Sequence, residues 1–467
     1  MANPSLSEYI SQSQRGLYQS IFGDGMMKKG PGIGTGATSF QTGSTGDASS
    51  TASIFTTTYG RKVWQALNNQ TRFFNAIPRV VWGNTAGWRV RTDRGTNRSN
   101  PVLEAGALPT VDVSNIEPVS SLPRIVATTF GASVKSVFTA QLEGGIGDVL
   151  ALENENAQLD HMKEINEELL SASRMVASAV GGATTTSNII NGMANNVHVG
   201  DTFYMLDADG PAVRTGGAIT AASEGAANTT LTHPAWSSGT SAAGDILYAY
   251  QRAGITSIDD VVEADAISSG ITWPAGATSG PKAYDVTYAR ADGAWAAAAN
   301  VDYNAGVPRD LSLNMLDTCI QKVRENGGEP KLILLGHDQY FKLERLLNSQ
   351  QRYMGQEEYQ VGVGSERTFP GTRTGLVLAT YMGIPILPDA DVPRSQEIAS
   401  PYAAQGSNIY VLDTDYIEMA IAQPTQYIEN RDYFAANQLV IRGLLYTMGE
   451  MRCRNFFVQA KIGDLTA

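Results

Sequence analysis

Few residues of this 467-residue chain have the types and spacing that catalysis or cofactor binding requires. The run from Gly30 to Gly36 is rich enough in glycine for a phosphate-binding loop. Such a loop usually follows a strand and opens a helix, and its Walker form ends in Gly-Lys-Ser or Gly-Lys-Thr. This run leads only into more Gly, Ser and Thr, so we predict no phosphate site there.

Histidine, cysteine and acidic residues form no recognisable metal-binding motif. Each of the four histidines lacks a second His or Cys at ligand spacing: His161, His198, His233 and His337. Segment 207–210 resembles part of a calcium loop but lacks the later bidentate Glu, so an ordinary turn is the better interpretation. Cys319 and Cys453 are predicted to be small buried hydrophobes. The sequence therefore predicts no catalytic residue, no metal site and no cofactor.

The composition argues against two classes of protein, nucleic-acid binders and membrane proteins. The net charge is −12, whereas a primary nucleic-acid binder would be basic. Hydrophobic residues make up 42% of the chain, enough for a large core, but no run of about 18 apolar residues could cross a membrane. The first residues have no basic or apolar signal-peptide region, so we expect synthesis in the cytosol and no membrane partner.

The N-terminal residues predict a helix on a tether. Apolar residues fall on one face of a short amphipathic helix over 5–22. Residues 23–59 are rich in Gly, Ser and Thr and cannot bury a core, so they are expected to form an extended arm. A helix on such an arm suits docking at a distance, for example on another subunit.

Residues 88–130 predict a long two-stranded hairpin. Trp88 and Val90 alternate with polar residues, and the return strand is expected to run through Val111, Val113 and 125–128. The tip is polar and carries arginines. A hairpin of this length is marginal alone and needs a surface to lie on.

The strongest predicted helix covers 148–180. Asp148 can cap it, apolar residues recur at steps of three, four or seven, and Gly181 and Gly182 end it. The helix would be about 50 Å long at about 1.5 Å per residue. Its other face is strongly acidic: Glu153, Glu155, Asp160, Glu164, Glu167 and Glu168.

The rest of the sequence, from residue 195 on, indicates a β-rich segment followed by a large module of helices and strands. Residues 195–252 are rich in Gly, Thr and Ala, and we expect a small inserted β-barrel or sandwich there. The last third should contain a helix from Asp310, a buried strand over 331–335 and a helix after Asp338. A polar loop over 349–375 and strands near 376–380, 384–387, 408–413 and 416–421 follow, and two closing strands near 438–447 and 451–462 end the chain.

This order of modules resembles the Hong Kong 97-type fold of the major capsid proteins of tailed double-stranded DNA viruses. The resemblance is carried by the predicted hairpin, the long helix, segment 331–335 with its following helix, segment 382–387, and the tail from 438 to 461. It implies an α+β fold with these parts: an N-terminal arm at 1–87, an E-loop at 88–130, a P-domain with a spine helix at 131–194, the β-rich insertion at 195–252, a P-domain connector at 253–309, an A-domain at 310–432 and closing P-domain strands at 433–467.

The resemblance also implies a structural function without enzymatic activity. Identical subunits would form the pentamers and hexamers of an icosahedral shell around double-stranded DNA, without reading its sequence. Portal, scaffolding and possible decoration proteins would be partners, and the virion would be the location. Some relatives cross-link through an E-loop lysine, but no lysine occurs here between Lys62 and Lys135.

An electrostatic contact between subunits is the expected replacement for that cross-link. Arginines at the hairpin tip would meet the acidic helix face of a neighbouring subunit: Arg91, Arg94 and Arg98 on one side, and Glu153, Asp160, Glu164 and Glu167 on the other. Each exposed pair contributes only about 0–1 kcal/mol, so the contact would need several pairs and apolar support.

The sequence is also compatible with two other functions. An encapsulin-like compartment would use the same fold, although its subunits are shorter and usually have no large β insertion. Residues 310–432 could instead form a nucleotide-binding α/β enzyme domain. That alternative needs a Gly-rich phosphate turn after the first strand, and segment 335–338, Leu-Gly-His-Asp, does not provide one.

Overall fold

The computed structural model describes residues 71–466 apart from segments 84–86, 94–101, 103, 105, 110–112, 141–147, 177–183, 191–196, 207–212, 225–227, 238, 242–244, 264–282, 285–293, 305–307, 349–355, 361–367, 373–379, 395–405 and 432–438. The predicted helix at 5–22 and the arm at 23–59 lie outside the described residues. The described parts of 128–158 and 427–445 form one compact unit, and those of 68–127, 159–426 and 446–467 form a second.

A six-stranded mixed sheet lies in the second unit, with the order β12-β21-β18-β13-β17-β16. β13 pairs in parallel with β17 and antiparallel with β18. The strands are β12 (Asn300–Asp302), β21 (Ala460–Ile462), β18 (Ile409–Leu412), β13 (Leu332–Leu335), β17 (Ile384–Pro388) and β16 (Thr380–Tyr381).

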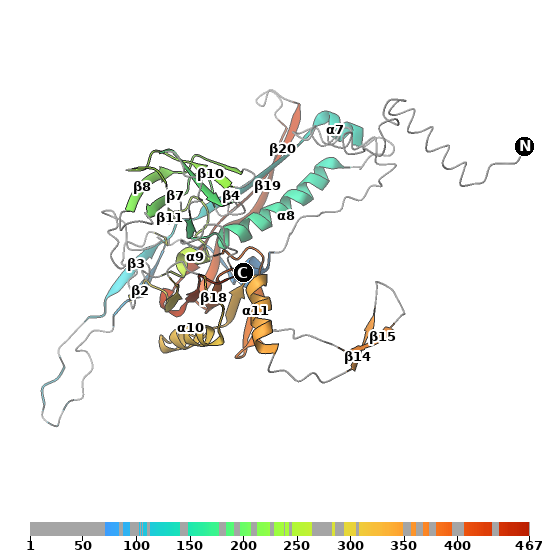
Figure 1. The fold of residues 1–467 in the computed structure, drawn as a ribbon. Helices are drawn as coiled ribbons and strands as arrows, with labels where there is room; N and C mark the ends of the chain where they lie inside the picture. The colour runs from blue at the N-terminus through green and yellow to red at the C-terminus, as the bar shows by residue number, and fades with distance from the viewer. Residues whose placement is uncertain are drawn as a thin grey trace, which may run out of the picture. The chain divides into compact units, whose positions relative to one another are not determined.

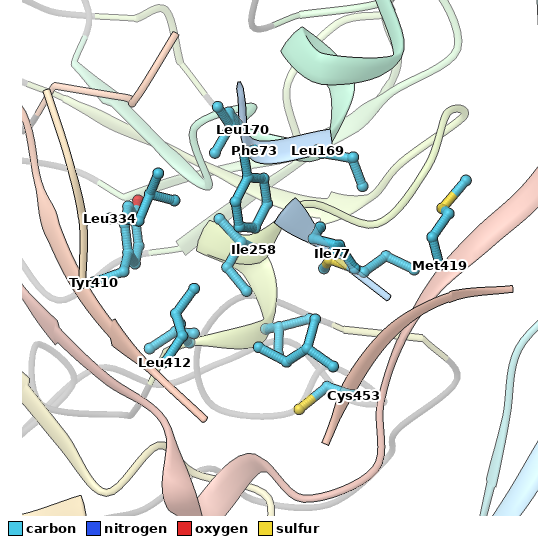
Figure 2. Packing of buried hydrophobic residues seen from close by; sticks show 14 of the residues in the cluster. Phe73, Ile77, Leu169, Leu170, Ile258, Leu334, Tyr410, Leu412, Met419 and Cys453 are labelled. Carbon is cyan, nitrogen blue, oxygen red and sulfur yellow. The ribbon is translucent and has the colours of Figure 1, made fainter. Parts of the chain in front are cut away.

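The two central strands bury both faces because their side chains alternate between two apolar clusters. One cluster includes residues of α10 (Leu313–Glu325) and α11 (His337–Asn348), together with Ile333, Leu335, Ile409 and Val411. The other, drawn in Figure 2, includes Phe73, Ile258, Leu334, Tyr410 and Leu412. The predicted buried strand and its two flanking helices are thereby confirmed.

A second sheet, in the order β1-β19-β20-β4, corrects the predicted end of the chain. Its strands are β1 (Arg79–Val81), β19 (Ile417–Asn430), β20 (Val440–Cys453) and β4 (Arg124–Ser133). The prediction of separate strands at 438–447 and 451–462 was wrong, because β20 continues through the break. Gly449 lies between the two predicted strands, and a Cβ there would lie 2.8 Å from the Ala420 carbonyl oxygen. Glycine therefore permits a close backbone approach within the sheet.

The end of the tail takes a different place from the one predicted. After a 3-10 turn at Phe456–Val458, β21 joins the six-stranded sheet between β12 and β18. Conversely, β19 lies in the sequence range predicted for the A-domain but pairs outside that sheet. The expected polar loop at 349–375 also contains paired strands, β14 (Gln356–Gln360) and β15 (Thr368–Thr372).

The long helix is shorter than predicted. α8 (Val149–Leu169) begins at the expected cap, since the Asp148 Oδ1 atom accepts the Leu150 N–H at 3.0 Å, but it ends well before Val180. Ser173 donates its N–H and its hydroxyl to the Asp259 Oδ2 atom, both at 2.7 Å. These bonds take the chain away from the helix axis and into β5 (Arg174–Val176). At 21 residues, α8 spans about 30 Å.

The β-rich segment is larger than predicted. One sheet has the order β6-β10-β9 and another β5-β11-β7-β8. The strands are β6 (Thr186–Ile190), β7 (Thr202–Leu206), β8 (Val213–Ala218), β9 (Ala221–Glu224), β10 (Asn228–Thr232) and β11 (Ile246–Gln251). Both sheets contribute to one apolar cluster that includes Ile189, Phe203, Met205, Leu231 and Leu247. We call this part, from β5 to β11, the β module; it begins near residue 174 rather than 195.

The first unit has a small core of its own. It contains α7 (Val134–Ala140), and an apolar cluster groups Ala132 and Val149 with Val137 and Leu150. The Phe130 and Tyr427 rings stack with centroids 5.9 Å apart. No helix in the described part of the chain combines the length and apolar character needed to cross a membrane.

A buried charge network connects α9, β18 and β21 in the second unit; Figure 1 labels α9 and β18. Lys461 on β21 is fully buried, and its Nζ lies 2.8 Å from Asp259 Oδ1 and 2.6 Å from Glu263 Oε2. Asp259 belongs to α9 (Ile258–Val261) and also accepts the Tyr410 hydroxyl at 2.7 Å. Burial would raise the pKa of Asp259, but the Lys461 charge and these hydrogen bonds bring it down to about 2.

Replacing the buried Lys461 should therefore lower the stability of the protein. We expect Lys461→Met to lower the free energy of unfolding by about 3–5 kcal/mol, because two buried carboxylates lose their counter-charge. Urea denaturation followed by circular dichroism measures this change. The matched control is Lys331→Met, which removes an exposed ion pair of similar length with Asp415, 2.6 Å, and should change stability little. Equal effects of the two substitutions would contradict the assignment.

A second buried carboxyl group, that of Glu450 on β20, should make the free energy of unfolding depend on pH. Burial is the largest influence and raises its pKa from 4.5 to about 8, while the Thr256 N–H bond, 2.7 Å, and the Arg124 charge oppose the rise. A raised pKa means that the folded state holds the proton more tightly. The stabilisation is therefore fully present below about pH 4.5 and is lost as the pH rises through about 8.

Glu450→Gln should flatten this dependence. Between about pH 5 and pH 8, the wild-type free energy of unfolding should lose up to about 1.4 kcal/mol per pH unit from this group, and the variant should not show that loss. Urea titrations at both pH values make the comparison. Glu325→Gln, at an exposed carboxylate, is the control and should keep the wild-type slope. An unchanged slope in Glu450→Gln would refute the effect.

Candidate functional site

The base of the hairpin is joined to the core. β2 (Gly87–Arg91) pairs antiparallel with β3 (Ile116–Ser120), so that Gly87 faces Ser120 and Arg91 faces Ile116. A Cβ at Gly87 would lie 2.1 Å from the Val119 carbonyl oxygen, so only glycine allows this approach. Trp88 packs edge-on against the Tyr284 ring with centroids 5.2 Å apart.

The pairing corrects the predicted return strand. The prediction used Val111, Val113 and 125–128, but the partner strand is β3, and 125–128 belongs to β4 in another sheet. Both stretches alternate apolar and polar residues, so the local pattern cannot distinguish them. Val119 decides the register, because it is buried in the same apolar cluster as Phe73 and Ile258.

Beyond its base, the hairpin exposes aliphatic side chains. Leu108 is 84% exposed, Val113 81% and Ile116 53%. Exposed apolar groups in one segment are typical of a surface that another molecule covers. Arg91 is also exposed, and its Nε donates to the Asp93 carbonyl at 3.2 Å, whereas Arg94 and Arg98 lie outside the described residues.

The four predicted acidic contact residues on α8 differ in their surroundings. Asp160 is exposed and Glu153 is half-buried. Glu164 lies 3.2 Å from the His198 Nε2 atom, and Glu167 lies 3.4 Å from the Lys163 Nζ atom. The last two carboxylates therefore already have partners in their own chain. Asp160 is the most accessible of the four for a neighbouring subunit.

A cluster of charged side chains at the end of α8 was not predicted from the sequence. Glu168, one turn after Glu164, lies 3.6 Å from the same His198 Nε2 atom. Burial raises the pKa of Glu168 to about 7, although the His198 charge opposes this rise. The pKa of His198 is raised, because three nearby carboxylates outweigh its burial. The i, i+4 spacing of the glutamates was visible in the sequence, but the approach of His198 was not.

These three side chains are also the ones that could hold a metal ion. Among the described residues, Glu164, Glu168 and His198 place one ligand atom each within 4.8 Å of the others. Two hydroxyl–imidazole pairs also occur among the described residues, Thr447 with His161 at 2.7 Å and Ser187 with His233 at 2.9 Å, and all four residues are buried.

Comparison with known proteins gives the family. The family model described as SU10 major capsid protein matches residues 33–432. No curated protein matches the chain. Among solved structures, the chain is similar to one described as the capsid asymmetric unit of cyanophage A-1(L), with 12% identity, a TM-score of 0.52, and coverage of 87% of this chain and 96% of that chain.

Two further solved structures are similar over comparable lengths. The capsid of a native GTA particle has 12% identity, covers 87% of this chain and 93% of its own, and has a TM-score of 0.44. The SrpI encapsulin complex of Synechococcus elongatus has 11% identity, covers 88% and 95%, and has a TM-score of 0.37.

The family match gives the general role, and the similarity to the cyanophage capsid structure supports the fold. The protein has a capsid fold of mixed helix and sheet content, forms the shell of a tailed phage, and associates with its own copies in the virion. The exposed aliphatic hairpin agrees with such association. The chain belongs to the SU10 major capsid protein family.

Proposed function

We propose that this protein builds an icosahedral shell of pentamers and hexamers around double-stranded DNA, with a Hong Kong 97-type layout. In this proposal β2 and β3 form the E-loop, α8 is the spine helix, and the six-stranded sheet is the core of the A-domain. The β module is an insertion in the P-domain. The observation that carries the proposal is a hairpin whose base packs on the core and whose described residues Leu108, Val113 and Ile116 are exposed.

The hairpin supports association because it has too little support of its own. A two-stranded ribbon is marginally stable in water. Burying apolar surface contributes about 25 cal/mol per Å², so covering several aliphatic side chains stabilises both the ribbon and the contact. A second copy of this chain is the partner in the proposal, since the family forms shells from its own copies.

Electrostatic contacts add orientation to this apolar contact. In the proposal, Arg91 and the tip residues Arg94 and Arg98 approach the acidic face of α8 on a neighbouring copy, with Asp160 as the main acceptor. Glu164 and Glu167 contribute less because His198 and Lys163 already contact them. These two then act mainly within the subunit; Glu153 stays a candidate contact.

The other partners follow from the shell. A portal and a separate scaffolding protein would act during assembly, and decoration proteins could bind the β module. The net charge of −12 suits the enclosure of DNA without tight or sequence-specific binding. The protein acts as a structural element and requires no catalytic residues in this role. Negative-stain microscopy of the purified protein should show closed polyhedral particles or capsomer rings; a monodisperse monomer would refute the proposal.

Reversing the charge of the hairpin tip should block assembly. We expect the triple variant Arg91→Glu, Arg94→Glu and Arg98→Glu to remain folded but to form few or no closed particles, because like charges then face one another. Circular dichroism checks the fold and negative-stain microscopy counts the particles. The matched control replaces the same residues by lysine and should assemble. Normal shells from the glutamate variant would end the electrostatic part of the proposal.

Removing the exposed aliphatic groups should weaken assembly by a separate route. We expect Leu108→Ser with Val113→Ser to raise the protein concentration needed for particle formation at least about tenfold, since each buried aliphatic side chain contributes about 1.5–3 kcal/mol. The thermal unfolding midpoint of the isolated subunit should not fall. Light scattering against concentration measures assembly.

The control for the aliphatic variant is Val199→Ser, at an exposed position in the β module, which should assemble like the wild type. Unchanged assembly of the double variant would show that these side chains stay exposed in the shell.

A further inference from the structure

Two elements bring three potential metal ligands together near the C-terminal end of α8. Glu164 and Glu168 lie on one face of the helix, because residues four apart are neighbours there. His198 belongs to a turn before β7 and lies 3.2 Å and 3.6 Å from their carboxylates. These separations suit one shared ion, since ligands about 2.0–2.1 Å from a tetrahedral zinc lie about 3.3–3.4 Å apart.

The backbone around the cluster is arranged to hold these groups. The His198 N–H donates to Asp201 Oδ2 at 3.0 Å, and the Asp201 N–H donates to the His198 carbonyl at 3.1 Å. Gly200, between them, has a φ of +102°, which favours glycine. On the other side, a Cβ at Gly254 would lie 1.9 Å from Glu168 Oε2, so glycine there makes room for the carboxylate.

The second nitrogen of His198 lies near a carboxylate that can become its partner. Its Nδ1 atom is buried without a hydrogen-bond partner in the described structure, and Asp201 Oδ2 lies 3.9 Å away. Histidines that bind metals usually donate their other N–H to a carboxylate, carbonyl or water. A small rotation of the ring would bring this N–H to Asp201 while Nε2 faces the ion.

The charge around the cluster also favours a cation. Among the described residues, the network connects four carboxylates and two groups that can be positive: Glu164, Glu168, Asp201 and Asp260, with His198 and Arg252. Buried carboxylates need compensation by paired charges or metal ions. The side chains of Glu164 and His198 are partly exposed, so an ion can enter from solvent.

We propose that Glu164, Glu168 and His198 bind one divalent transition-metal ion, with Asp201 orienting the imidazole. An imidazole with two carboxylates suits zinc, manganese or iron better than calcium, which prefers oxygen ligands alone. The bound ion connects α8 to the segment that precedes β7 in the β module, within one subunit. This inference is independent of the proposed shell contacts, because no residue of a second copy takes part.

Zinc is the probe for the test. The purified full-length protein, first treated with EDTA and then dialysed against Zn²⁺, should retain one zinc per chain by elemental analysis. His198→Gln and Glu168→Gln should each lower the affinity for zinc at least about tenfold. The matched control is His337→Gln, at the start of α11, which should bind like the wild type. Circular dichroism checks that each variant is folded.

Thermal unfolding gives a second readout. At a zinc concentration about a hundredfold above the dissociation constant, the wild-type midpoint should rise by about 3 °C, and that of His198→Gln should not. Calcium at the same concentration should not reproduce the shift. Equal zinc binding by wild type and both ligand variants would overturn the site. So would a wild type that retains no zinc, which would leave the cluster as an ion pair between His198 and the two glutamates.

Discussion

The Asp259 carboxylate, fully desolvated beside Lys461, is the interaction on which the second unit depends. It accepts bonds from Lys461 on β21, Tyr410 on β18 and Ser173 after α8, so one side chain joins three segments far apart in sequence. Such a group is tolerated inside a protein only when every polar atom is satisfied. The network thereby specifies where the tail must lie and where the helix must stop.

The core and the hairpin differ in how far their apolar side chains are covered. In the sheet of β13 and β18, each alternate side chain meets an apolar cluster on its own side. Among the described residues of the hairpin, those of the base have such a neighbour, through Trp88 and Val119, whereas the aliphatic Leu108, Val113 and Ile116 are exposed. A chain that exposes apolar groups on a marginal ribbon is incomplete as a monomer, which accords with membership of a family of shell proteins.

Much of the fold could be predicted from local patterns, and the errors share one cause. The buried strand at 332–335, the helices beside it and the cap at Asp148 were correct because each depends on residues near in sequence. The end of α8, the return strand of the hairpin and the continuous β20 were wrong. At each point the local pattern allowed two outcomes, and a distant partner decided: Asp259 for the helix end, Val119 in the core for the hairpin, and the Ala420 backbone for the strand.

For the candidate sites too, some features follow from the local sequence and others depend on distant partners. By itself, the sequence determined the acidic helix face and the arginine-bearing hairpin, because composition and periodicity are properties of contiguous residues. Only the tertiary structure decided that Glu164 and Glu167 have partners within the chain, that Glu168 meets His198, and that Lys461 reaches Asp259 across 202 positions. Such pairs form because burial forces separated charges to find one another, and no spacing along the chain records which of them will meet.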